Sequence, residues 1–117
     1  MKTHHDLDVW KKAIDLVTKI YALTKGFPKE EMFGLTNQIR RAIVSVPSNI
    51  AEGAARNTSK EFNNFLSIAL GSLSEVETQL IISKNLKYIN QENLDFHLSD
   101  LIVIRKMIIG LKKSLKL

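Results

Sequence analysis

Basic side chains that could contact phosphate groups gather at two places in this sequence. Lysine and arginine outnumber aspartate and glutamate by 17 to 12, which gives a net charge of +5 and permits a polyanionic partner. Such a patch attracts phosphates with a strong salt dependence, whereas a solvated face that keeps the protein soluble is the alternative. The first candidate set is Arg56, Lys60, Lys112, Lys113 and Lys116, and the second is the pair Arg40 and Arg41.

Polar side chains also recur at intervals of three and four residues along one edge of the second expected helix. If the second and third helices are antiparallel neighbours, Arg41 could reach Glu75 across the seam between them. The stripe is either a recognition surface or a buried network that fixes helix register or subunit packing. The second interpretation is favoured because buried charges usually need partners. The candidate network is Gln38, Arg41, Ser45, Ser48, Asn49, Glu52 and Glu75.

The sequence contains no recognised motif for catalysis or for metal binding. A di-iron bundle needs Glu-x-x-His on two helices, and this sequence has none; His97 stands alone outside the N-terminal His4-His5 pair. Neither a phosphate-cradling glycine loop nor a nucleophile elbow is present. The absence of cysteine excludes disulfides and thiolate metal sites. We therefore expect no catalytic residues, no metal and no cofactor, and we expect that the protein is not an enzyme.

Four amphipathic helices are predicted to position these residues. Apolar residues recur at helical spacing, and no stretch alternates with the period of two that is typical of strands. Short breaks between long helices favour antiparallel neighbours. The predicted fold class is therefore all-α, an antiparallel up-down-up-down four-helix bundle that forms a single domain over residues 1–117. The expected helices span about 8–25, 28–56, 59–87 and 91–115.

Pro47 falls in the middle of the second expected helix. A proline there removes one backbone hydrogen bond and clashes with the carbonyl one turn back, at a cost of about 3 kcal/mol. We therefore predict that helix two is kinked at Pro47, with polar neighbours such as Ser45 and Asn49 satisfying the freed backbone groups. Two glycines, Gly53 and Gly71, are expected to permit close approach of helices.

The third and fourth expected helices are apolar on more than one side. Because a single bundle would expose part of that surface, we predict self-association through it; an unusually wide core stripe is the alternative. The core seam of the second expected helix is predicted to begin at Met32. On the fourth, the core face is predicted to hold Leu94, Leu98, Leu101, Ile102, Ile108 and Leu115, with Ile104 lying elsewhere around the helix.

Several segments carry a family resemblance. They are residues 7–13, Phe33-Gly34-Leu35, residues 38–42 and 44–53, and Gly71-Ser72 with Glu75 in the third expected helix. Through them nearly the whole chain resembles the four-helix-bundle proteins encoded in intervening sequences of bacterial 23S ribosomal RNA genes. It also resembles the related accessory protein of diversity-generating retroelements, a basic pentamer that binds nucleic acid and a reverse transcriptase. The resemblance implies a ring-like homopentamer.

From these observations we predict a non-catalytic, oligomeric bundle that binds structured nucleic acid, either RNA (alone or in a ribonucleoprotein) or DNA, through its basic end. The alternative is a module for protein–protein interaction or assembly that has no role with nucleic acid. Residues 1–8 are polar and do not form a signal peptide. The longest uninterrupted apolar runs are too short to span a bilayer. We therefore expect a cytoplasmic location and no membrane partner.

Overall fold

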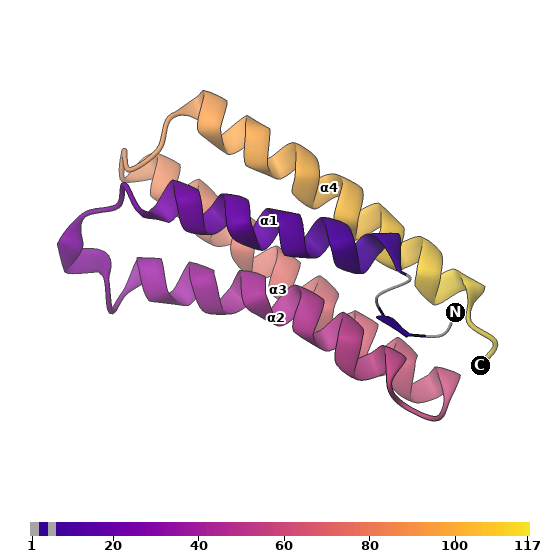
Figure 1. Ribbon diagram of the computed structural model, residues 1–117. Helices are drawn as coiled ribbons and strands as arrows, with labels where there is room; N and C mark the ends of the chain where they lie inside the picture. Colours follow the sequence, from indigo (N-terminus) through magenta and orange to yellow (C-terminus); the bar gives the residue numbers. More distant parts are fainter. Residues whose placement is uncertain (1–2, 5–6) are drawn as a thin grey trace.

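The computed structural model describes residues 3–4 and 7–117, and it contains four α-helices, one short 3-10 helix and, within those residues, no strand. This confirms the all-α, four-helix fold that the periodicity predicts. Figure 1 shows the helices running back and forth along one long axis, so that both chain termini lie at the same end. The elements are α1 (Asp8–Thr24), η2 (Lys29–Glu31), α2 (Leu35–Ala54), α3 (Ser59–Asn85) and α4 (Gln91–Ser114).

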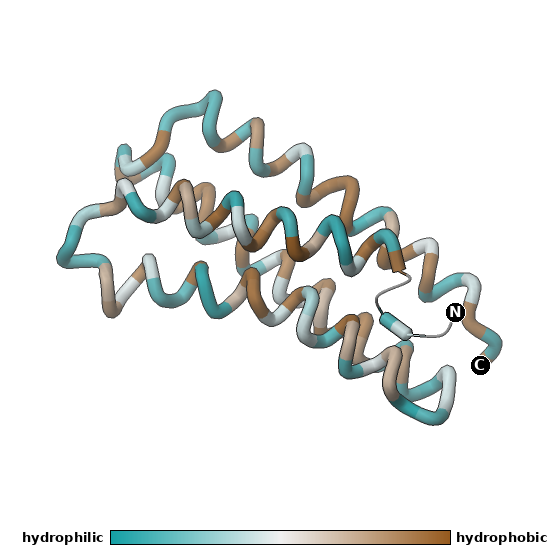
Figure 2. The backbone as a smooth tube through the Cα atoms, viewed as in Figure 1, coloured by the Kyte–Doolittle hydropathy of each residue, from teal (hydrophilic) through white to brown (hydrophobic). Residues whose placement is uncertain are grey.

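Each helix packs against two others, in the pairs α1–α2, α2–α3, α3–α4 and α1–α4, and the α2–α3 contact is the most extensive. Hydrophobic residues recur along all four helices, as Figure 2 shows. One stripe of each helix is buried in a shared core. Burial of such stripes, rather than intrinsic helix propensity, supplies most of the stability of helices of this length. The fully buried side chains include Leu16, Ile20, Ile39, Ile43, Ile50, Leu66, Leu73, Leu80, Leu101 and Ile108.

The helix that was predicted over 28–56 is shorter in the structure. Gly34, with φ −113° and ψ −114°, separates η2 from α2, because a glycine inside a helix is disfavoured and readily adopts other conformations. The prediction that the seam begins at Met32 is wrong, since this side chain is 51% exposed. The buried stripe of α2 instead begins at Thr36 and continues through Ile39.

The core face of α4 also differs from the prediction. Ile104 is 1% exposed and faces the core, whereas Ile102 is 46% exposed. His97 takes a buried position next to the predicted Leu98, and its Nδ1 lies 2.7 Å from the carbonyl oxygen of Asn93. The prediction failed because α4 is apolar almost all round, so the period alone does not select one face.

Pro47 is buried inside α2, and the helix continues through it. One turn away, the Asn49 side chain donates from Nδ2 to the carbonyl oxygen of Ser45 at 2.8 Å and lies 2.9 Å from the Ser45 Oγ. Ser45 Oγ is in turn 2.8 Å from Ser72 Oγ, so this short chain of hydrogen bonds joins α2 to α3. Polar side chains therefore support the backbone near the proline, while the kink itself stays a prediction.

The long helix α3 begins at an N-cap, where the Thr58 hydroxyl accepts a hydrogen bond from the backbone N–H of Glu61 at 3.1 Å. Among the described helices, α3 is the one whose length and composition would suffice to cross a membrane. Core helices of soluble proteins meet the same criterion, so a single helix of this kind is weak evidence for a membrane span. One stripe of α3, which includes Leu66, Leu73 and Leu80, is buried in the bundle.

Candidate nucleic-acid interface

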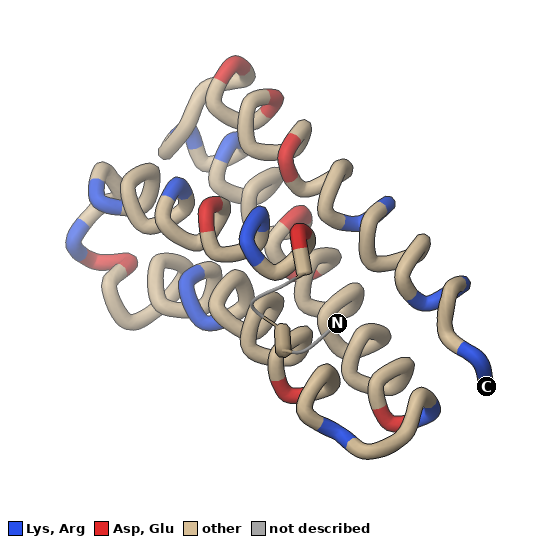
Figure 3. Tube along the Cα trace, turned by 45° about the vertical axis from the view of Figure 1, so that its right-hand side comes forward, with Lys and Arg blue, Asp and Glu red and all other residues tan. Residues whose placement is uncertain are grey.

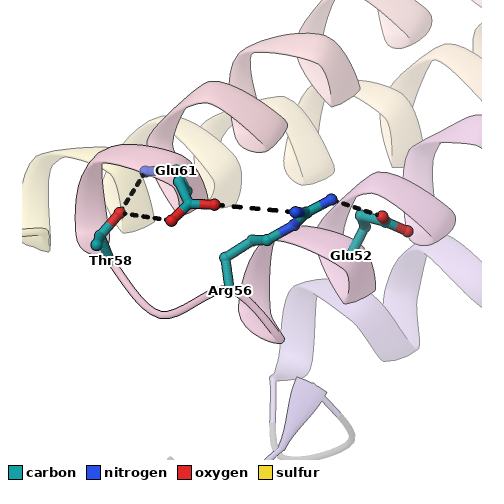
Figure 4. Close-up of polar contacts among 4 residues, drawn as sticks. All are labelled: Glu52, Arg56, Thr58 and Glu61. Atoms are coloured by element: carbon teal, nitrogen blue, oxygen red, sulfur yellow. Dashed lines mark hydrogen bonds and ion pairs between the residues drawn. The ribbon is translucent and has the colours of Figure 1, made fainter.

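Arg56 lies in the turn between α2 and α3, where its charge is balanced by two carboxylates (Figure 4). Its Nη2 donates to Glu52 Oε1 at 2.9 Å, and its Nη1 is 3.9 Å from Glu61 Oε2. The guanidinium also lies over the Phe65 ring, 4.8 Å from its centre. Arg56 thus fastens the end of α2 to the first turn of α3, and little of its charge is left for an external phosphate.

Lys112 is also occupied within the chain. Its Nζ donates to the carbonyl oxygen of Asn63 at 3.4 Å and to the hydroxyl of Ser67, both on α3. The lysine therefore joins α4 to α3 near the end that holds the chain termini. An amine with these neighbours is a weaker candidate for phosphate contact than a fully solvated one.

The other three lysines of the first set, Lys60, Lys113 and Lys116, are exposed, and no ion pair within the described part of the chain involves them. Lys60 lies in the first turn of α3, and Lys113 and Lys116 lie at the end of α4 and just beyond it. No acidic residue follows Asp100 in the sequence. Figure 3 shows basic residues recurring along the last part of α4 up to the C-terminus. These lysines form the solvated basic surface of this end, which we call the lysine end.

The second candidate pair separates in the structure. Arg40 points to α1, where its Nε donates to Thr24 Oγ1 at 2.8 Å and its Nη2 to the carbonyl oxygen of Tyr21 at 3.4 Å. Arg41 is exposed on the α2–α3 side. Adjacent positions on a helix point about 100° apart, so the two guanidinium groups do not form one patch. Neither belongs to the lysine end.

Part of the predicted polar stripe lines an open groove between α2 and α3 with a volume of about 320 Å³. Arg41 and Glu75 both face this groove, but no ion pair within 4.0 Å joins them. Ser48 and Asn49 lie outside its lining, as does Glu52, which pairs with Arg56 instead. The lining residues are Gln38, Arg41, Ala42, Ser45, Ser72, Glu75 and Gln79.

At the opposite end of the bundle, sequence reasoning missed a hydrogen bond between two distant residues. The Tyr88 hydroxyl donates to Glu31 Oε2 at 2.7 Å, and Glu31 Oε1 accepts from the backbone N–H of Leu35 at 3.2 Å. The Tyr88 hydrogen bond, followed by that of Leu35, holds the pKa of Glu31 below its ordinary value. The same carboxylate raises the pKa of Tyr88. No local pattern signals this pair, because 57 residues separate its members.

Replacing Tyr88 with phenylalanine should raise the pKa of Glu31 toward its ordinary value. Because the folded-state pKa of Glu31 is lowered, this carboxylate stabilises the fold above its unfolded pKa, and the contribution is lost as pH falls through the folded pKa. Tyr88→Phe should therefore weaken the dependence of stability on pH in the acid range. A ¹³C NMR titration of the Glu31 carboxyl checks this result. Tyr21→Phe is the control, and an equal shift in both variants would contradict the assignment.

Comparison with known proteins agrees with this fold. The family of 23S rRNA-intervening sequence proteins matches residues 5–110. The chain belongs to this family. A crystal structure of a protein with unknown function from the S23 ribosomal protein family of Bacteroides thetaiotaomicron is similar to it, with 28% sequence identity and a TM-score of 0.83. That similarity covers 91% of this chain and 99% of the other. None of the curated proteins matches this chain.

Membership of the 23S rRNA-intervening sequence family establishes the fold and the relatives but assigns no activity. The geometry offers a solvated group of lysines and an open polar groove. No group of three or more His, Asp or Glu side chains within the described ranges could hold a metal ion. The features that remain for a functional argument are therefore charge and exposed apolar surface.

Proposed function

We propose that this member of the 23S rRNA-intervening sequence family is a non-catalytic, self-associating bundle that binds structured nucleic acid through its lysine end. The observation that carries the proposal is that Lys60, Lys113 and Lys116 are exposed and lack ion-pair partners within the described residues. Solvated lysines of this kind release counterions when they meet phosphates, which favours binding to any polyanion. A cytoplasmic location agrees with this function and stays a prediction.

Self-association would strengthen this binding. If the lysine ends of several subunits gather around one axis, three lysines per chain become a continuous basic rim. A rim of that kind engages several phosphates at once, and simultaneous contacts multiply the affinity without any new chemistry. No aromatic side chain lies among the three lysines in the sequence, so we expect recognition of backbone charge rather than of base sequence.

The test is fluorescence anisotropy of the protein with a labelled RNA hairpin and a DNA duplex across a salt series. Binding should weaken linearly in a plot of log affinity against log salt. Replacing Lys60, Lys113 and Lys116 with glutamine should reduce the slope by about 3 for duplex binding, because each lost phosphate contact contributes about 0.9. Measurement of native mass alongside would establish whether the variant still assembles.

A matched control removes the same charge from the other end, through Lys25, Lys29 and Lys84→Gln. This variant should keep the wild-type slope. Equal loss in both variants would show that net charge alone drives binding and that the lysine end has no special role. Absence of binding by the wild-type protein at low salt would remove the nucleic-acid proposal altogether.

An assembly module without a nucleic-acid role is the second candidate, and exposed isoleucines favour it. Arg105 Nη2 donates to Glu77 Oε1 at 2.7 Å, which places these residues on the seam between α3 and α4. Ile81 follows Glu77 by four residues, and Ile102 and Ile109 lie three before and four after Arg105, so all three occupy the same seam. All three are exposed. We call this strip the isoleucine seam.

A further inference from the structure

A cavity of about 380 Å³ lies where the end of α1, η2 and the first turn of α2 meet, far along the chain from the residues of the lysine end. This volume falls within the range of small-molecule pockets, roughly 300–1,000 Å³. Its walls are mostly apolar and include Phe27, Pro28 and the ring of Tyr21. Met32, which the sequence wrongly predicted to be a core residue, also lines it. Methionine at the margin of an apolar cavity adapts readily to ligands of different shape.

Three basic side chains line this cavity, and no acidic side chain does. They are Lys25 at the end of α1, Lys29 in η2 and Arg40 in α2. The acid nearest to the lining in sequence, Glu31, is engaged by the Tyr88 hydroxyl and the Leu35 N–H. The cavity therefore combines apolar walls with an uncompensated positive charge, which suits a ligand that has an apolar body and an anionic group.

Arg40 is held in place by contacts that leave part of its guanidinium free. Its Nε and Nη2 donate to Thr24 and to the Tyr21 carbonyl, and its guanidinium lies 4.6 Å from the centre of the Tyr21 ring. No acceptor is found for Nη1 within the described residues. A guanidinium that is fixed by packing loses little freedom when it binds a carboxylate, and charge-assisted hydrogen bonds of this kind are among the strongest in proteins.

A second polar group of the lining has no partner. Thr36 is 4% exposed, and its Oγ1 is buried without a hydrogen bond in the described structure. Buried hydroxyls are usually hydrogen-bonded, and one that is not calls for an explanation. A ligand acceptor in the cavity that Thr36 lines would supply the missing bond after a rotation about χ1.

We propose that this cavity binds a small organic carboxylate with an aromatic or aliphatic body. Arg40 would donate from Nη1 to the carboxylate, Lys29 would add a flexible positive charge, and Phe27 and Met32 would cover the apolar body. The site is separate from the lysine end, so it stands or falls independently of the nucleic-acid proposal. Carboxylate binding there would draw α1, η2 and α2 together at this end of the bundle.

Isothermal titration with 4-phenylbutyrate tests the site, and 4-phenylbutanol serves as the uncharged analogue of the same shape. We expect the carboxylate to bind at least about tenfold more tightly than the alcohol, a ratio that corresponds to about 1.4 kcal/mol. Amide NMR shifts on addition of 4-phenylbutyrate should be confined to residues around 21–40. Absence of binding, equal affinity for the alcohol, or shifts located elsewhere would each overturn the proposal.

Adjacent arginines supply matched variants. Arg40→Gln should weaken 4-phenylbutyrate binding at least about tenfold, whereas Arg41→Gln, which removes the same charge on another side of α2, should change it less than about twofold. Because Arg40 also links α2 to α1, the exposed Lys29→Gln provides a second variant that leaves this link intact, and it should weaken binding about threefold. Equal effects of Arg40→Gln and Arg41→Gln, or wild-type binding by Lys29→Gln, would contradict the assignment.

Discussion

Replacing Gly53 with alanine should destabilise the protein by about 2 kcal/mol. A Cβ at this position would lie 2.7 Å from Phe65 Cβ, 2.9 Å from Phe62 Cδ1 and 3.3 Å from the Phe62 carbonyl oxygen. Two of these atoms belong to or adjoin the backbone, so α2 and α3 would have to separate. Overpacking of this kind costs about 1–3 kcal/mol, and the better helix propensity of alanine offsets at most about 1 kcal/mol.

Gly71 provides the matched control for this change. A Cβ there would meet nothing within 4 Å, so the prediction that Gly71 permits close helix approach is wrong within the single chain. Gly71→Ala should stabilise α3 by about 0.5–1 kcal/mol through helix propensity. Urea denaturation of both variants measures the two effects. A stabilised Gly53→Ala would contradict the tight α2–α3 packing, and a destabilised Gly71→Ala would indicate a partner on this face of α3.

Local signals predicted the elements well. Breaks with capping residues at Thr58 and Asn90 place the starts of α3 and α4, and both side chains cap as such residues should. The start of α2 was missed because an apolar period ran through Met32, and only the backbone at Gly34 shows that the helix begins later. Periodicity describes side chains, whereas a helix also depends on what each backbone position tolerates.

The functional residues were less predictable, because a charge acts together with neighbours that are remote in sequence. Arg56, Lys60 and Lys112 are equivalent in a sequence count, yet Arg56 is held by two carboxylates and Lys112 bonds to Asn63, 49 residues away. Lys60 alone of the three stays solvated without such a partner in the described structure. Sequence therefore gave the sign of the charge at this end, and the fold decides which side chains can use it.

Arg40 and Arg41 make the same point over a single residue. Both were predicted as a second phosphate-binding pair, but Arg40 packs on the end of α1 and Arg41 faces the groove between α2 and α3. Helix geometry alone separates them, while the partner of each depends on which helix lies on that side. The cavity beside Arg40 could not be predicted, because it is formed by three elements and begins with an exposed η2 that was expected to be helix and core.

Replacing Ile102 with lysine should weaken self-association by at least about 100-fold if the isoleucine seam is the subunit interface. Ile102 is exposed in the single chain, so a lysine there should leave the bundle folded. In an interface the same lysine would have to bury an unpaired ammonium group, at a cost of several kcal/mol, and each 1.4 kcal/mol is a factor of ten in the dissociation constant. Sedimentation over a concentration series measures that constant, and circular dichroism measures folding.

The control is Val44→Lys, which adds the same charge at an exposed apolar position of α2 outside the seam. It should leave the dissociation constant unchanged. Equal weakening by both variants would point to charge repulsion rather than to the seam, and wild-type assembly of Ile102→Lys would exclude the seam as the interface. Because the basic rim at the lysine end requires assembly, a monomeric but folded Ile102→Lys should also lose most of its affinity for nucleic acid, and this couples the two halves of the proposed function.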